Sequence, residues 1–110
     1  MDDLAQKTLL YDFYGEMLTK RQQEVFEDYY LNDLSLGEIA AELSISRAAV
    51  HDNLKRCEKA LNNFEDKLKL INKFLDNKKV IEAILEMTYE DKPDTLINIR
   101  ELITDIIETL

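Results

Sequence analysis

The 110-residue sequence has only one cysteine, one proline, two glycines and no tryptophan. The single cysteine, Cys57, excludes an intramolecular disulfide, and one histidine cannot complete a metal site with it. Because proline and glycine are scarce, long stretches lack helix breakers, which favours helices over a many-turned sheet. No window holds the ~18 to 20 consecutive apolar residues of a membrane span. The acidic start, MDDLAQK, is unlike a signal peptide. We therefore expect an all-α cytoplasmic protein.

Signatures of catalysis and of cofactor binding are also missing. The sequence has no glycine-rich phosphate loop, no Ser-His or Cys-His arrangement and no metal-ligand spacing. Its carboxylates are scattered over polar helix faces, where solvation is their ordinary role. We expect no enzyme activity, no catalytic residue, no metal site and no cofactor.

The charge is strongly acidic overall but unevenly distributed. A net charge of −9 argues against nucleic-acid binding, since Lys and Arg contacts to phosphate supply much of the affinity. However, residues 1–45 carry −7 and residues 76–110 carry −5, whereas residues 46–75 carry +3. The one basic segment is thus a candidate for contact with phosphate.

Two amphipathic helices are expected before residue 34. The first covers residues 3–14, and Gly15 is its expected stop. Thr19 followed by Gln22 is a capping-box pair, which predicts a second helix from residue 20. The turn-forming Asn-Asp pair at 32–33 marks its end.

The stretch SLGEIAAELSISRAAVHDNL, from Ser35 to Leu54, has the features of a helix-turn-helix. Ser35 and Glu38 form a second capping box at the start of a short helix. Ala40 is small enough for a close helix crossing, and Ile45 is expected to fill the angle of the turn. Ser46 is the expected N-cap of the next helix. The expected buried positions of the motif are Leu36, Ile39, Ala40, Leu43, Val50 and Leu54.

The outward face of the second helix of this motif is the candidate nucleic-acid-binding site. Its N-terminal N–H groups could meet a phosphate, and its first turns could enter a major groove. Asp52 on the same face would repel phosphate, although a carboxylate can accept from a cytosine amino group or interact with the helix dipole. The candidate contact residues are Ser46, Arg47, Ala48, His51, Lys55, Arg56 and Lys59.

The same helix is expected to be long, from residue 47 to residue 75. Apolar residues alternate at spacings of four and three along it, so a partner surface is needed over its whole length. Either the later helices or a second subunit could supply that surface. Cys57 lies on this seam, where we expect it to be a small buried residue, and we assign the tyrosines and phenylalanines to the core. The seam comprises Val50, Leu54, Cys57, Leu61, Phe64, Leu68, Ile71 and Leu75.

The C-terminal third predicts two further helices. The Asp-Asn pair at 76–77 indicates a break, followed by a helix over residues 78–89. Pro93 lies in a polar turn over 90–94, and the last helix is expected from about Thr95 to Thr109. The expected organisation is a helix-turn-helix domain over 1–66 and a helical extension over 67–110. The extension would pack on that domain or on a second subunit.

Three known families share these motifs wholly or in part. The run LTKRQQEVFEDYYLNDLSLGEIAAELSISRAAVHDNLKRCEKAL resembles region 4 of bacterial sigma factors in its LT-x-R-x-x-EV opening, LS-x-x-EIA middle and SR-x-x-V recognition helix. LuxR-type output domains share part of this pattern. Over nearly the whole chain, the closer resemblance is to the YlxM family of small bacterial helix-turn-helix proteins. It is carried by the YDFYGEMLT lead-in, the motif directly after it, the long helix and the acidic helical tail.

The YlxM resemblance implies a regulatory protein, assigned to the signal recognition particle pathway from gene neighbourhood. We expect binding of nucleic acid, DNA or RNA, through the helix-turn-helix, with signal recognition particle components as further partners. One alternative is a protein–protein adaptor that uses the motif as a scaffold. Another is a sigma-like DNA-binding transcription regulator, though not a complete sigma factor, since no second domain is expected. Homodimer and monomer both remain open.

Overall fold

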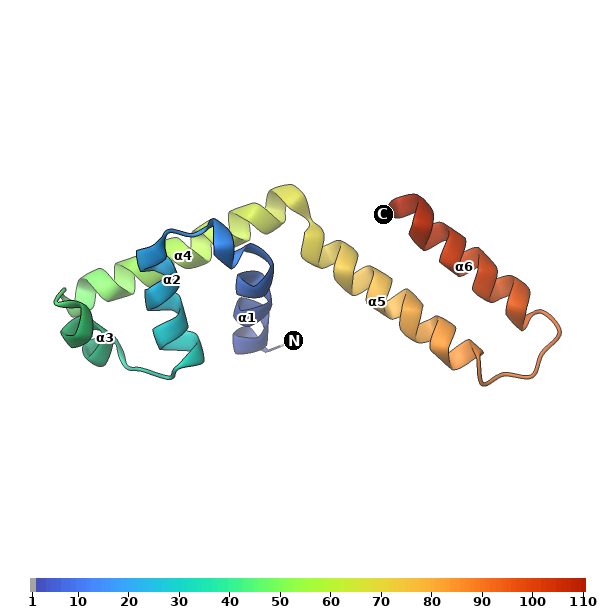
Figure 1. Cartoon of the computed structure of the whole chain (residues 1–110), viewed down its shortest axis with the longest axis horizontal. Helices are drawn as coiled ribbons and strands as arrows, with labels where there is room; N and C mark the ends of the chain where they lie inside the picture. The colour runs from blue at the N-terminus through green and yellow to red at the C-terminus, as the bar shows by residue number, and fades with distance from the viewer. Residues whose placement is uncertain (1) are drawn as a thin grey trace. The chain divides into compact units, whose positions relative to one another are not determined.

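The computed structural model describes residues 2–110, and these residues form six α-helices and no strand (Figure 1). This confirms the all-α prediction. The chain divides into a first unit that ends at Ile71 and a second unit, Asn72–Leu110. None of the helices in residues 2–110 combines the length and the apolar character needed to cross a membrane.

Helix α1 spans Asp3–Tyr14, as predicted. The Asp2 carboxylate caps it by accepting from the Ala5 N–H at 2.7 Å. The chain then continues into a single 3₁₀ turn, Gly15–Met17. A Cβ at Gly15 would lie 2.9 Å from the Tyr11 ring, so only glycine leaves room for that ring at the end of the helix.

Helix α2 spans Lys20–Phe26 and continues as a π-helical turn to Leu31. The predicted capping box is present. The Gln22 N–H donates to the Thr19 hydroxyl at 3.2 Å, and the Thr19 N–H donates to the Gln22 side chain at 3.0 Å. The helix ends at the predicted turn, where Asp33 takes a left-handed φ of 56° that aspartate tolerates.

Helices α3 (Leu36–Leu43) and α4 (Arg47–Leu68) form the helix-turn-helix. The second capping box is confirmed. The Glu38 N–H donates to the Ser35 hydroxyl, and the Ser35 N–H donates to the Glu38 carboxylate. Between the helices, Ser44 adopts a left-handed φ of 57°, which turns the chain within three residues. Helix α4 then begins directly after Ser46, the predicted N-cap residue.

The core of the motif forms where α3, α4 and α2 meet. Its buried residues are Val25, Ile39, Ala40, Val50 and Leu54. Each fully buried Val, Leu or Ile side chain contributes about 1.5–3 kcal/mol. The partly buried residues packed around them are Tyr30, Leu34, Leu36, Leu43 and Ile45. Of these, Leu36 and Leu43 had been expected to be buried. The predicted roles of Ala40 and Ile45 therefore agree with their positions.

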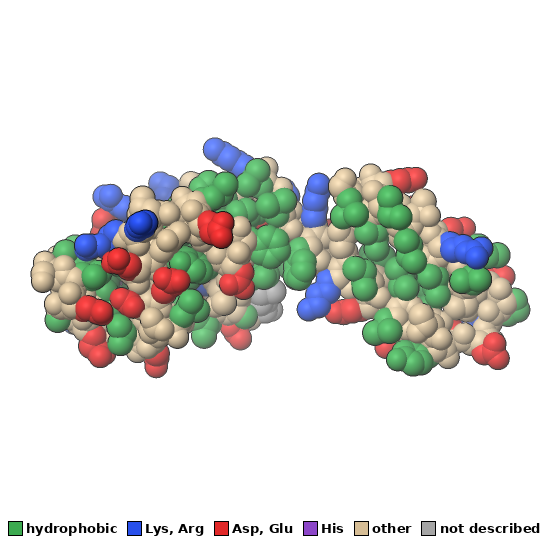
Figure 2. Space-filling view, in the orientation of Figure 1, with side chains coloured by type: hydrophobic (Ala, Val, Ile, Leu, Met, Phe, Trp, Pro, Cys, Tyr) green, Lys and Arg blue, Asp and Glu red, His purple; other side chains and the backbone are tan. Residues whose placement is uncertain are grey.

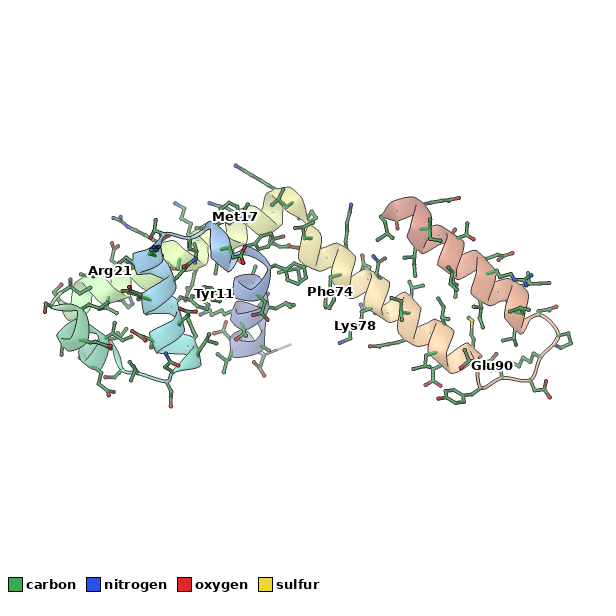
Figure 3. All side chains as sticks on the ribbon, in the orientation of Figure 1. Tyr11, Met17, Arg21, Phe74, Lys78 and Glu90 are labelled. Atoms are coloured by element: carbon green, nitrogen blue, oxygen red, sulfur yellow. The ribbon has the colours of Figure 1, made fainter. Side chains whose placement is uncertain are left out.

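Aromatic side chains extend this core toward α1. Tyr14 and Phe26 are fully buried, and the Tyr11 ring stacks on Phe26 with centroids 4.4 Å apart. Figure 3 shows Tyr11 on the side of α1 that faces α2. The assignment of the aromatic residues to the core is wrong for Tyr89, which is 79% exposed, and for three residues that are 36–44% exposed, Phe13, Tyr29 and Phe74.

The long helix predicted over residues 47–75 is interrupted. Helix α4 ends at Leu68, Lys69 adopts a left-handed φ of 57°, and α5 runs from Leu70 to Met87. Two of the N–H groups at the start of α5 donate to side chains. The Leu70 N–H donates to the Tyr14 hydroxyl at 3.2 Å, and the Ile71 N–H donates to the Glu65 carboxylate at 3.0 Å.

The break predicted at residues 76–77 is wrong, because α5 passes through it. Asp and Asn cost a helix interior less than about 0.7 kcal/mol each, and apolar residues continue on both sides. The expected domain boundary at 66/67 falls inside the first unit. Residues 68–71 stay attached to that unit through the hydrogen bonds just described and through buried Ile71.

The second unit is a helical hairpin. Helix α6 spans Thr95–Thr109, as predicted, and it is joined to α5 by turns over residues 88–94. The two helices run antiparallel (Figure 1).

Candidate nucleic-acid interface

The core fixes which side of α4 faces outward. Val50, Leu54, Cys57 and Leu61 are 0–5% exposed and recur at spacings of four and three, so they form one stripe. The residues on the opposite side of the helix cannot contact the core. These outward positions include Ala48, Asp52, Lys55, Arg56 and Lys59, with Arg47 and His51 beside them.

All seven predicted contact residues are exposed, and all lie at or after the start of α4. Figure 2 shows Lys and Arg side chains gathered over the α4 side of the first unit, whereas Asp and Glu side chains occupy much of the rest of that unit. The charge segmentation of the sequence therefore becomes a separation of charge between faces of the first unit.

Ser46 acts as the N-cap of α4. Its hydroxyl accepts from the Ala49 N–H at 3.0 Å. This cap satisfies one of the N–H groups that lack a partner within a helix. The N–H groups of Arg47 and Ala48 remain directed out of the helix end, next to the Arg47 side chain. That arrangement is suited to an anion.

An ion pair divides the cations of this face into two kinds. The Arg56 guanidinium lies 3.1 Å from the Asp52 carboxylate, one helical turn earlier. Arg56 is therefore partly neutralised by a neighbour, although an exposed pair of this kind is weak and can exchange for a phosphate. Within residues 2–110, Arg47, Lys55 and Lys59 form no ion pair.

The rear of α4 is held by a polar network that the sequence reasoning missed. Glu58 accepts from the Tyr30 hydroxyl and lies 3.0 Å from the Lys7 ammonium, which donates to Tyr30 at 2.9 Å. Burial lowers the pKa of Lys7, but its hydrogen bonds to Tyr30, Glu58 and Asp3 outweigh this and raise it above the ordinary value. Lys7 therefore stays charged.

This network joins three helical segments, α1, the π turn and α4, whose residues are far apart in the sequence. A weak signal was present, since Lys7 and Glu58 each lie next to apolar positions on their helices. Nothing in the local sequence indicated that the two would meet. The result is that the recognition helix is anchored from behind while its charged front remains exposed.

Other parts of the first unit are less suited to nucleic acid. A surface hollow of about 590 Å³ lies between α2, its π turn and α3. Its lining includes Glu24, Glu27, Asp28 and Glu42, which would repel phosphate. Within residues 2–110, no group of three or more His, Cys, Asp or Glu side chains is arranged to hold a metal ion.

Comparison with known proteins confirms the YlxM resemblance. Residues 1–102 match the family described as "Putative helix-turn-helix protein, YlxM / p13 like". A UPF0122 protein of Thermoanaerobacter sp. (strain X514) is 50% identical over 114 residues, which cover 97% of this chain and 96% of the relative. A UPF0122 protein of Bacillus licheniformis is 40% identical over 110 residues, which cover 100% of this chain and 97% of the relative. The chain therefore belongs to the UPF0122 family of YlxM/p13-like helix-turn-helix proteins.

Proposed function

We propose that this protein binds nucleic acid through the front of α4, which is defined by the exposed residues Ser46, Arg47, Ala48, His51, Lys55, Arg56 and Lys59. The observation that carries the proposal is the combination of a helix-turn-helix with exposed cations on α4 that have no ion-pair partner among residues 2–110. Arg47, Lys55 and Lys59 would contact phosphates. Ala48 and His51, in the first turns, would meet base edges in a groove.

The front of α4 is only moderately basic, which limits the affinity it can reach. Three unpaired cations and one paired arginine neutralise few phosphates, and the rest of the chain is acidic. We therefore expect weak binding with a clear dependence on salt. A groove or a folded nucleic acid that presents phosphates on two sides of one helix would suit it best.

Substitution of the front cations tests the proposal. Arg47→Ala, Lys55→Ala and Lys59→Ala should each weaken binding of a fluorescent duplex about 3–10-fold and reduce the slope of log affinity against log salt by roughly 1. Lys79→Ala, an exposed lysine of α5, is the matched control and should leave affinity unchanged. Equal effects of all four variants would rule out a specific role for the front of α4.

The choice between DNA and RNA, and the pathway, need a separate experiment. Family resemblance favours the signal recognition particle, so its RNA and protein components are the ligands to test first. Titrations would compare that RNA, a hairpin RNA of unrelated sequence and duplex DNA. A preference for the particle RNA that is lost with Arg47→Ala would support this pathway. Sequence-specific binding to duplex DNA would instead support a sigma-like transcription regulator.

An adaptor that binds protein is the second candidate, and it is favoured by the net charge of −9 and by Asp52 at the centre of the front of α4. The two candidates predict opposite effects of Asp52→Ala. Removing a carboxylate should strengthen binding to phosphate, whereas it should weaken binding to a basic protein surface. Affinity capture from lysate with and without nuclease treatment separates them, because only protein-mediated complexes survive the nuclease.

A further inference from the structure

The second unit has no core of its own. Residues 72–110 are all described, and none of them is buried. Units of fewer than about 40 residues usually need disulfides, metals or association to be stable. This unit contains no cysteine, and within its described residues no three His, Asp or Glu side chains are arranged to hold a metal ion. Association with another surface is therefore the remaining source of stability.

Two apolar stripes run along the hairpin, and they differ in exposure. The first is half-buried, at spacings of three, four and seven residues, and consists of Val80, Ile84, Met87, Ile99, Leu102 and Ile106. The second is 43–85% exposed and consists of Ile81, Leu85, Leu96, Ile103, Ile107 and Leu110. We call the second stripe the hairpin face.

The residues of the hairpin face lie on one side of the hairpin. On each helix, at 100° per residue, the exposed stripe is rotated in the same sense from the half-buried stripe. Because α5 and α6 are antiparallel, equal rotations bring the two exposed stripes to the same side. Figure 2 shows hydrophobic side chains gathered over the second unit.

We propose that the hairpin face binds the same face of a second copy of the chain, so that two hairpins form a four-helix bundle. Apolar residues on two adjacent stripes of a helix are typical of such bundles, in which each helix contacts two neighbours. Taking roughly 200 Å² for a fully exposed large apolar residue, the hairpin face offers roughly 700 Å². A standard interface buries ~800 Å² per partner.

A second copy fits this face for two reasons. All six residues are aliphatic, so no charge on the face calls for a partner of opposite charge. A two-fold contact requires only that the patch complement itself, which a continuous aliphatic stripe does. The dimer thus uses the C-terminal extension, which the sequence offered as one possible contact with a second subunit. It does not use the first half of the α4 seam, because Val50, Leu54, Cys57 and Leu61 are buried within the first unit.

Sedimentation equilibrium of the full chain tests the proposal. The expected mass is twice 12.9 kDa at high concentration. Ile103→Glu, in the centre of the hairpin face, should raise the dissociation constant of the dimer ~100-fold. Ile97→Glu is the matched control, since Ile97 is 56% exposed on the same helix but points away from the hairpin face. This control should remain dimeric.

A substituted chain could lose the dimer simply by unfolding, so amide hydrogen exchange of the unmodified protein provides a second test. Protection of residues 72–110 should rise with protein concentration, whereas protection of the core around Val25 and Ile39 should not. A one-chain mass at every concentration would overturn the proposal, whether the face packs on the first unit or on a different protein. Equal effects of Ile97→Glu and Ile103→Glu, or exchange independent of concentration, would overturn it as well.

Discussion

Cys57 is the only thiol of the chain, and it is fully buried against α2. Its Sγ lies 3.6 Å from the carbonyl oxygen of Gln22 and 3.4 Å from Oδ1 of Asn53. Burial raises the pKa of the Cys57 thiol to about 11, and the nearby Glu58 carboxylate adds to the effect. The residue is therefore a neutral, unreactive part of the core, as the sequence predicted.

This burial predicts a loss of stability in mild base. The folded chain holds the neutral thiol, while the unfolded chain ionises near its ordinary pKa of 9.0. The contribution of Cys57 is thus complete below pH 9 and is lost as the pH rises toward 11. By pH 10 the free energy of unfolding should fall by about 1 kcal/mol, as measured by urea denaturation.

Cys57→Ala is the control for this pH dependence. The variant should be less stable at pH 7 by about 1 kcal/mol because it leaves a small cavity. Its stability should fall less steeply than that of the unmodified chain between pH 8 and pH 10. The pKa values of Tyr14 and Tyr30 are raised by groups other than Cys57, so these two residues affect both proteins alike, whereas Cys57 contributes to the raised pKa of Tyr11. Identical slopes would contradict the assignment to Cys57.

At the scale of helices, the interruption between α4 and α5 depends on one residue, Lys69. A left-handed conformation costs a non-glycine residue roughly 1–2 kcal/mol. Lys69→Gly should therefore raise the free energy of unfolding by about 0.5–1 kcal/mol in urea denaturation. If residues 47–75 formed one straight helix, the same substitution would lower it by about 1 kcal/mol.

The sign of this change distinguishes a bend from a continuous helix. Lys69→Ala is the control, since alanine gains nothing in the left-handed region and should give no increase in stability. Ser44→Gly, at the other left-handed position that follows an α-helix, should stabilise the chain in the same way. A destabilising Lys69→Gly would indicate that α4 and α5 are continuous in solution.

The helix boundaries divide into those that local sequence determines and those that it does not. The capping boxes at Thr19 and Ser35 act within three residues, so the starts of α2 and α3 could be predicted. The start of α5 is set by Tyr14 and Glu65. Tyr14 lies 56 residues from Leu70, and such a contact leaves no trace in local periodicity.

The features of the candidate interface also divide into those that local sequence determines and those that it does not. Helical periodicity was enough to place Arg47, Lys55 and Lys59 on the exposed front of α4. The pairing of Asp52 with Arg56 follows from their i, i+4 spacing and could have been foreseen. The network of Lys7 and Glu58 behind the helix could not, because it forms only once the fold is complete.

At the scale of the whole molecule, burial is concentrated in the first unit. Every buried residue between 2 and 110 lies between Leu10 and Ile71. A fragment of residues 1–71 should therefore fold cooperatively on its own and sediment as one chain. Circular dichroism, urea denaturation and sedimentation of this fragment would check the prediction.

The complementary fragment of residues 72–110 provides the contrast. Without a core, it should gain helical circular dichroism only as its concentration rises. A fragment 1–71 that fails to unfold cooperatively would show that the second unit supplies stability to the first. That result would contradict the assignment of the core to the first unit alone.

The network behind α4 also limits how the motif can be reused. Glu58 meets Lys7 of α1, so the back of the recognition helix is completed by residues that precede the helix-turn-helix in the chain. An excised segment of residues 35–68 would leave Glu58 without its cation and expose the apolar stripe around Cys57. The smallest fragment that could transfer this helix-turn-helix to another protein with its packing intact is therefore the whole first unit, including α1.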